Sequence, residues 1–366
     1  MINGISSNNI NGIIGSAVNG VTIEKQGILF ATTGTTFNPL ITLNAEASVR
    51  WEFDDNTTSS SLSPDITFAV GGDHSTKLVV TPWAALQRIN LGYGHDDGGS
   101  EAIPDHPVQP VTAIGNLSLV RETLVEFCAS RCPLTSISFR DFTALETLEM
   151  FSCQTITGID LYGTTNLRRT TIEDSDNNTT PPDFSASPNI YDIRFSRLEC
   201  THAIWAETDY EALWHLCCGL NPQFTENLPF DRFPVLAEVY THGNNQTGHL
   251  APSTDRLSFF RGENNNWTTA DFTGCFSAGP SAGNLYLQGN NLTSLIIDNC
   301  PNIDFLNCQD NNFGVAAVNA ILQSLDDQGG IDGTVDLSQQ TPAAIPTNTT
   351  AIASLEGKGW TVTVDS

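Results

Sequence analysis

The chain has 366 residues, 39% of them hydrophobic, which is enough to bury the cores of two or three domains. Its formal net charge is −26, with 41 acidic residues and three lysines, so nucleic acid and anionic lipid would both be repelled. No stretch approaches the ~20 apolar residues of a membrane span, and the N-terminus lacks the features of a secretory signal. We therefore expect a folded protein that binds no nucleic acid and does not insert into a membrane.

The N-terminal segment, residues 1–27, contains three eight-residue repeats built on an Asn-Gly pair between β-branched residues. Asn-Gly favours tight hairpins because both residues tolerate positive φ, but hairpins this small bury too little area to be stable alone. They should dock on the rest of this chain or on another protein. Our hypothesis is an assembly anchor formed by Ile2, Asn3, Gly4, Ile5, Ile10, Asn11, Gly12, Ile13, Val18, Asn19, Gly20 and Val21.

Residues 28–92 alternate apolar and polar side chains between turn clusters, which predicts a small β-sandwich. The run Trp51-Glu52-Phe53-Asp54-Asp55-Asn56, followed by Ile66-Thr67-Phe68 and Lys77-Leu78-Val79-Val80, resembles the PKD family of Ig-like modules. Asp54-Asp55-Asn56 replaces the Gly-Asp-Gly turn of that family. The resemblance implies an Ig-like fold for this domain, and residues 93–112, rich in Gly, Asp, His and Pro, are expected to form a linker.

Residues 113–314 carry the strongest periodicity in the chain. Ile303, Leu306, Cys308, Asn311 and Phe313 fit the leucine-rich-repeat template L-x-x-L-x-L-x-x-N-x-L. A second match has Cys153 in the asparagine position. Apolar positions recur at every tenth or eleventh position, at Leu124, Leu134, Leu145, Ile156 and Leu167 and again at Ala282, Leu292 and Ile303.

Two such steps make a coil of about 21 residues with extended segments on opposite sides. Asn290 and Asn311 lie one coil apart, as do Cys132 and Cys153, so we expect short side-chain ladders at both positions. The pattern therefore predicts a solenoid.

The register weakens between about residues 198 and 281. There the spacing of Tyr210, Leu213, Trp214 and Cys217 predicts an amphipathic helix from Asp209 to Gly219. The same region is rich in aromatic residues, and two interpretations stay open. The aromatic side chains fill the core of irregular coils, or some of them form a ligand surface, for which the candidates are Trp205, Tyr240, Phe260 and Trp267.

The C-terminal segment, residues 315–366, is expected to close the solenoid. Residues 315–325 have helical spacing ending at Gly329-Gly330, a second helix is predicted near Thr349 to Glu356, and residues 359–364 read as a final strand. A solenoid requires such a cap to cover its last apolar layer.

The sequence offers no candidate for catalysis or for a cofactor. For a metal ion it offers only side chains of the expected linker without a fixed scaffold, namely His95, Asp96, Asp97, Asp105 and His106. The nine cysteines are odd in number, and several occupy repeat core positions, which favours buried free thiols in a reducing compartment. Cys128 and Cys132 lack a second pair at zinc spacing. No Ser/His/Asp order or phosphate loop stands out, so we expect a protein without enzymatic activity.

Residues 290–312 resemble the 21-residue, cysteine-containing repeats of bacterial surface proteins of the internalin type. The segments Asn319-Ala320-Ile321-Leu322, Gly333-Thr334-Val335-Asp336-Leu337-Ser338 and Gly357-Lys358-Gly359-Trp360-Thr361-Val362 resemble the closing unit of leucine-rich proteins encoded by tailed bacteriophages. The expected fold class is mainly β with some α, an Ig/PKD-like β-sandwich followed by a leucine-rich-repeat solenoid with a helix-strand cap.

These resemblances imply a structural protein on the exterior of a phage virion. Its N-terminus would bind other virion proteins, and its repeats would face outward as a tail-fibre, receptor-binding or head-decoration element. A homo-oligomer and a host surface protein or glycan as partner are expected. The alternatives are a leucine-rich-repeat adhesin of a bacterial cell surface, binding protein or glycan, and a glycan-cleaving enzyme, for which no informative carboxylate pair is found.

Overall fold

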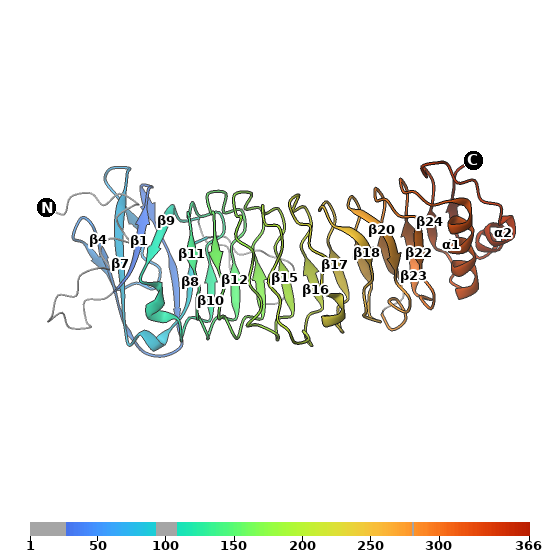
Figure 1. Cartoon of the computed structure of the whole chain (residues 1–366). Coiled ribbons are helices and arrows are strands. Elements are labelled where there is room, and N and C mark those ends of the chain that lie inside the picture. The colour runs from blue at the N-terminus through green and yellow to red at the C-terminus, as the bar shows by residue number, and fades with distance from the viewer. Residues whose placement is uncertain (1–26, 93–107, 280–281) are drawn as a thin grey trace. The chain divides into compact units, whose positions relative to one another are not determined.

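The computed structural model describes residues 27–92, 108–279 and 282–366 (Figure 1). The chain forms two compact units, one ending at Ser187 and one beginning at Pro188, which are taken in turn. The described part is mainly β with two α-helices, as the sequence predicts. The Asn-Gly repeats of the proposed anchor lie outside the described residues.

The first unit begins with a β-domain, and its main sheet is antiparallel with strand order β5-β4-β7-β1-β9. Trp51 is fully buried in its core, with its ring centroid 5.8 Å from those of Phe30 and Phe37. The strands and short 3-10 helices are β1 Ile28–Thr32, β2 Thr36–Phe37, β3 Leu40–Leu43, β4 Ser48–Phe53, β5 Thr58–Ser59, β6 Ile66–Thr67, β7 His74–Thr81, η3 Trp83–Ala85, β8 Leu86–Asn90, β9 Val111–Gly115 and η4 Leu117–Val120.

The sequence predicts a β-domain that a linker separates from the solenoid, and the structure differs from this prediction in two places. Strand β9 begins at Val111, within the segment expected to be a linker, and pairs with β1. Strand β8 pairs in parallel with the first strand of the coils, while β3 pairs antiparallel with β8. The domain therefore shares strands with the coils that follow it.

The coils of the first unit place short parallel strands side by side. Glu126 pairs with Thr147 and Thr147 with Arg169, so the strands recur at the interval of about 21 residues that the sequence predicts. On the opposite side of two coils, Ile137 pairs with Ile159. The strands are β10 Glu126–Cys128, β11 Ile137–Ser138, β12 Thr147–Glu149, β13 Ile159–Asp160 and β14 Arg169–Thr171.

The second unit continues the same construction with eight parallel strands, β15-β16-β17-β19-β21-β23-β24-β25. Three further strands, β18-β20-β22, form a parallel sheet from other segments of the same coils. The bounds are β15 Asp192–Arg194, β16 His215–Cys217, η5 Phe230–Arg232, β17 Glu238–Tyr240, β18 Thr247–Leu250, β19 Phe259–Arg261, β20 Asn266–Asp271, β21 Gly283–Tyr286, β22 Ser294–Ile296, β23 Ile303–Asn307, β24 Thr334–Asp336 and β25 Thr361–Thr363.

The predicted helix from Asp209 to Gly219 is wrong. Residues 215–217 form β16, and Tyr210, Leu213 and Leu216 are buried at the turn and the strand of one coil. The turn brings residues three apart to the same side, which imitates a helical period. The register also does not weaken here, because Asp192 pairs with His215 and His215 with Glu238; the coils only become slightly longer.

An asparagine ladder confirms the predicted positions Asn290 and Asn311. The side-chain amide of Asn290 donates to the carbonyl oxygens of Gly262 and Leu287, both at 3.0 Å, and its oxygen accepts from the N–H of Trp267. Each amide thus joins its own coil to the preceding one and satisfies buried backbone groups. Equivalent bonds are made by Asn221, Asn244, Asn265, Asn311 and Gln340.

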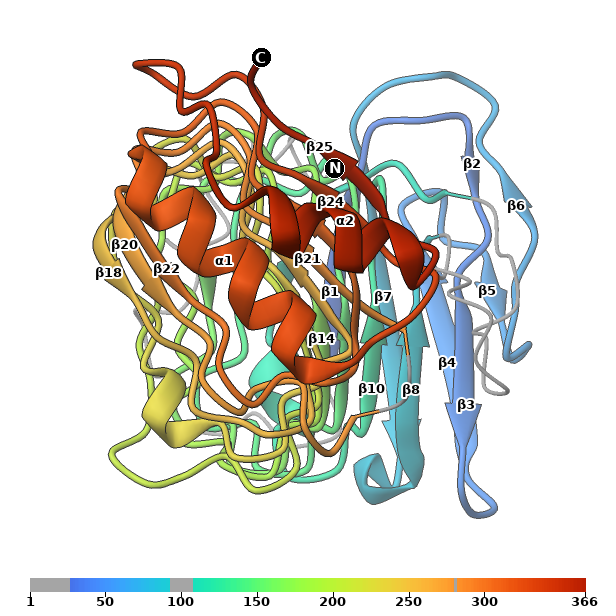
Figure 2. The same ribbon diagram turned by 90° about the vertical axis from the view of Figure 1, so that its right-hand side faces the viewer.

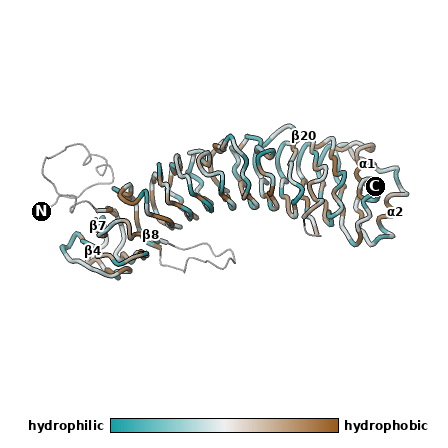
Figure 3. Tube along the Cα trace, turned by 90° about the horizontal axis from the view of Figure 1, so that it is seen from below, coloured by the Kyte–Doolittle hydropathy of each residue, from teal (hydrophilic) through white to brown (hydrophobic). Residues whose placement is uncertain are grey.

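Cysteine takes this position in the first unit. The thiols of Cys132 and Cys153 donate to the carbonyl oxygens of Leu91 and Ala129, each at 3.1 Å. The predicted cysteine ladder is therefore present. Figure 3 shows apolar and polar stretches alternating along the coils of each unit, as expected where every coil has a buried and an exposed side.

The C-terminal cap follows the prediction. Helix α1, Val315–Gln328, buries Val318, Ile321, Leu322 and Leu325 on one stripe and ends at Gly329, whose φ of 78° suits glycine. Helix α2, Thr349–Gly357, begins where the Asn348 side chain accepts from the N–H of Ala351. Figure 2 looks onto this end of the second unit, with both helices in front of the strands.

Candidate functional site

Strands β15, β16, β17, β19 and β21 of the second unit each bury one apolar side chain flanked by outward-facing residues. Ile193, Leu216, Val239, Phe260 and Leu285 are all fully buried. Because side chains alternate along a strand, the residues before and after each of these point to the other face, outward from the coil. This outward face of β15–β25 is the surface from which the candidate site is built.

A row of aromatic side chains crosses this outward face. We call His215, Tyr240, Phe259, Tyr286 and Phe305 the aromatic row. Successive ring centroids are 5.6, 5.1, 5.6 and 4.8 Å apart. Such pairs contribute about 0.5–1.5 kcal/mol each beyond their buried area. The four carbocyclic rings are half-buried, so their remaining surface is open to a partner.

One end of the aromatic row joins a buried ionic cluster. Asp192 accepts from Arg194 through both carboxylate oxygens at 3.1 Å and from Nδ1 of His215 at 2.7 Å. Burial acts to raise the pKa of Asp192, but the hydrogen bonds from His215 and Arg194 outweigh it and hold that pKa below the usual value. The cluster fixes His215 in place at the start of the row.

A second, polar row lies beside the aromatic row. The row consists of His242, Glu263 and Gln288, which come two residues after the ends of the adjacent strands β17, β19 and β21. Backbone hydrogen bonding between the coils continues here, from the Gly243 N–H to the Glu263 carbonyl oxygen. Arg261 donates to Oε1 of Glu263. Within the described residues, His242 Nδ1, Glu263 Oε2 and Gln288 Oε1 are buried without a hydrogen-bond partner. Burial is the main cause that lowers the pKa of His242.

The four aromatic residues proposed from sequence occupy different environments. Phe260 is the buried middle residue of β19, Trp267 is 1% exposed, and Trp205 is 9% exposed and packs on Tyr210 and Phe233. Of the four, Tyr240 alone lies on the outward face. The ligand-surface interpretation is therefore wrong for Trp205, Phe260 and Trp267, which fill the core as the other interpretation expects.

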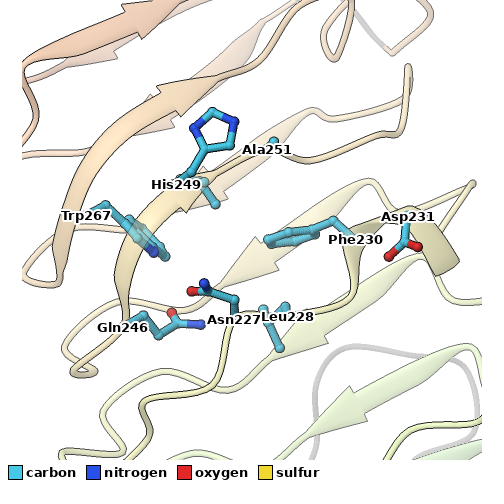
Figure 4. Close-up of a pocket in the computed structure, with 9 residues that line it drawn as sticks. Asn227, Leu228, Phe230, Asp231, Gln246, His249, Ala251 and Trp267 are labelled. Atoms are coloured by element: carbon cyan, nitrogen blue, oxygen red, sulfur yellow. The ribbon is translucent and has the colours of Figure 1, made fainter.

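A small pocket of about 170 Å³ lies on another side of the second unit. Figure 4 shows its lining: Trp267, His249, Phe230 and Asn227 surround it, with Gln246 and Asp231 at its ends. The amide of Gln246 already donates to the Glu226 carbonyl at 2.8 Å. Binding pockets for organic ligands are usually about 300–1,000 Å³, so this one suits at most a very small molecule.

The thiols have the properties of core residues. Burial raises the pKa of Cys128, Cys153, Cys200 and Cys275 to about 12, so at neutral pH they are protonated and poorly nucleophilic. In the part of the chain that the structure describes, no three His, Cys, Asp or Glu side chains are grouped to hold a metal ion. No helix there is long and apolar enough to span a membrane.

Two sequence comparisons give no relative: no family model matches the chain, and no curated protein matches it significantly. Among solved structures, a leucine-rich-repeat protein of Leptospira interrogans is 19% identical with a TM-score of 0.43, over 58% of this chain and 56% of that one. The leucine-rich-repeat domain of APL1 is 17% identical with a TM-score of 0.36, over 56% of this chain and 58% of that domain. This chain thus spans little more than half of either.

These likenesses are weak, and the repeat geometry of the chain itself decides the fold. Parallel strands recur at intervals within the leucine-rich range of about 20–29 residues, with a buried apolar middle residue and an asparagine or cysteine at the following turn. The chain has a leucine-rich-repeat fold. The outward face described above is the strand face of that leucine-rich-repeat sheet.

Sequence reasoning missed most of the aromatic row. Tyr240 and Phe259 stand in the aromatic-rich middle, but Tyr286 and Phe305 were not connected with them. The signal was available: each of these residues lies one position before or after a buried strand centre. It was hidden because the coils differ in length, since more of the chain separates Phe259 from its partner Asn284 than separates Glu238 from Phe259.

Proposed function

We propose that this chain is a non-enzymatic recognition protein that binds a macromolecular partner through the outward face of β15–β25. The observation that carries the proposal is the half-buried aromatic row on an open sheet. Large apolar side chains are also exposed elsewhere on the described surface, for example Val70 and Ile331. Clustered aromatic residues, however, are the side chains most often found at the energetic centre of interfaces.

The backbone under this face favours binding because it is already ordered. Each strand is hydrogen-bonded to its neighbours, and the asparagine ladder fixes the turn that follows it. A partner would therefore meet a surface that loses little conformational entropy on association. In the described part of the chain, no group of residues suits acyl transfer, phosphoryl transfer or metal-ion catalysis. We therefore propose no reaction.

For the biological setting, we propose the exterior of a virion, with residues 1–27 as the anchor and a PKD-like module in front of the repeats. This finer proposal is supported by the sequence resemblances alone. Mass spectrometry of purified particles tests it. Several copies per particle are expected, whereas recovery of the chain in the bacterial envelope fraction alone would favour the cell-surface adhesin.

The recognition face is tested by adsorption of the fluorescently labelled chain to candidate host cells. Replacing Tyr286 and Phe305 together by alanine should weaken adsorption at least about tenfold, since two ring contacts are lost. Tyr162→Ala is the control: this tyrosine, in the first unit, is 53% exposed and lies outside the aromatic row. Equal adsorption by the double variant and the wild type would reject the face.

A further inference from the structure

Glu238 lies inside the aromatic row. It pairs across the sheet with His215 on one side and Phe259 on the other, and Tyr240 follows it on the same face two residues later. Because adjacent strands are about 4.8 Å apart, the Glu238 carboxylate lies among the rings of these neighbours. Trp214, 41% exposed, adds a further ring 5.5 Å from His215.

The Glu238 carboxylate is uncompensated. In the residues that the structure describes it takes part in no ion pair or side-chain hydrogen bond, while two guanidinium groups of the same sheet are held by other acids. Arg194 is paired with Asp192, and Arg261 with Glu263. The negative charge of Glu238 also contributes, after burial, to raising the pKa of Tyr240. A half-buried carboxylate thus lacks a counter-charge among aromatic rings.

This combination attracts a cation. The faces of aromatic rings carry a negative quadrupole that draws ammonium and guanidinium groups, and a carboxylate adds a charge-assisted hydrogen bond. A ligand that brings several N–H donors is therefore favoured over one that brings acceptors.

We propose that the outward face of β16–β21 binds a basic polypeptide segment, with a lysine or arginine side chain seated on Glu238 between His215, Tyr240 and Phe259. This inference rests on the recognition function proposed above and names the chemistry of its partner. Charge complementarity selects this occupant: the net charge of −26 attracts a basic partner over long range. The aromatic row continues to Phe305, so an extended segment suits the face better than a single small cation.

The test uses the full chain and a blocked decapeptide of alternating lysine and glycine, with affinity measured by fluorescence anisotropy. The matched ligand is the same peptide with every lysine acetylated, which keeps the alkyl stems and removes the charges. We expect the lysine peptide to bind at least about tenfold more tightly than the acetylated one. A neutral oligosaccharide serves as the competing class of ligand.

The matched variants are Glu238→Gln and Glu211→Gln. Both remove one negative charge from the second unit, and Glu211 is exposed in the turn before β16, outside the aromatic row. Glu238→Gln should lower the affinity for the lysine peptide about tenfold, and Glu211→Gln should change that affinity little. Phe259→Leu, which removes a ring and keeps the charge, should also weaken binding. Circular dichroism establishes that each variant is folded.

Three outcomes overturn the proposal: equal binding of the two peptides, equal effects of the two glutamine variants, or preferential binding of the oligosaccharide. The proposed function has a separate readout in cell adsorption by the Tyr286/Phe305 double variant. If the double variant loses adsorption while Glu238→Gln changes neither adsorption nor peptide binding, the basic partner is rejected and the recognition face is kept. Unchanged adsorption in both variants would reject the face itself.

Discussion

The thiol of Cys153 donates its hydrogen to the carbonyl oxygen of Ala129 in the place that asparagine holds in other coils. A cysteine can make one such bond where an asparagine makes two or three, so it suits a turn with fewer backbone groups to satisfy. Its position also seals it from solvent. The consequence at the scale of a single residue is chemical inertness.

We expect Cys153 to resist alkylation in the native protein. Because burial raises its pKa to about 12, only about one thiol in ten thousand is ionised at pH 8, and reagent access is blocked as well. Iodoacetamide labelling followed by peptide mass spectrometry should show Cys153 unmodified in buffer and modified in urea. Cys217, the half-buried member of the nine, should be labelled first. Rapid native labelling of Cys153 would contradict its burial.

The buried carboxylate of Asp192 should make stability depend on pH. Its pKa is lower in the folded than in the unfolded chain, so it stabilises the fold above the unfolded value near 3.8, and this contribution is lost as the pH falls through the folded value. Asp192→Asn should lower the free energy of unfolding by about 2–4 kcal/mol at pH 7, because His215 and Arg194 lose their charged partner. Urea unfolding should show a smaller difference in stability between the wild type and Asp192→Asn near pH 3 than at pH 7.

At the scale of the element, the asparagine ladder holds one coil on the next. Asn290→Ala removes two donated bonds and one accepted bond and leaves buried carbonyl groups without a donor. We expect a loss of about 2–4 kcal/mol in the free energy of unfolding, measured by urea titration. Asn291→Ala is the control, since Asn291 is exposed and makes one weak 3.4 Å side-chain bond; similar losses for both would argue against the ladder.

The Asp365 carboxylate closes the ladder at the last turn. It accepts from the backbone N–H groups of Gln339, Gln340 and Ala344 at 2.7 to 3.1 Å. Asp365→Ala should therefore loosen residues 339–344 while the helices remain. Hydrogen exchange is the measurement, and protection is expected to fall in this segment and to be unchanged in α1. Unchanged protection at residues 339–344 would show that other contacts hold the turn.

The elements that followed a strict template could be predicted from sequence. Cys308, Asn311 and Phe313 occupy the expected buried positions, and α1 ends at the expected glycine. The turn around Tyr210 could not be predicted from sequence, because three-residue spacing occurs both in helices and in the turns of a coil. The aromatic row escaped because it depends on which residues face each other across strands, and that register shifts with each change of coil length.

At the scale of the whole molecule, electrostatic repulsion among the excess acidic residues destabilises the folded state. The formal charge is −26, and the described ion pairs are mostly at the surface, where each contributes little. Raising NaCl from about 20 to about 300 mM shortens the Debye length to below about 10 Å and should raise the melting temperature by a few degrees. Differential scanning calorimetry measures this. A fall in melting temperature would mean that the ion pairs outweigh the repulsion.

The side-chain bonds of each ladder residue reach no farther than the coil before it and the coil after it. A coil is consequently a unit that duplication or deletion of its coding segment could add or remove without disturbing coils elsewhere, provided that its ladder residue is kept. Every such event would lengthen or shorten the outward sheet by one strand and shift the spacing of its aromatic and charged residues. The architecture thus gives a lineage a simple route to new specificities while the fold stays the same.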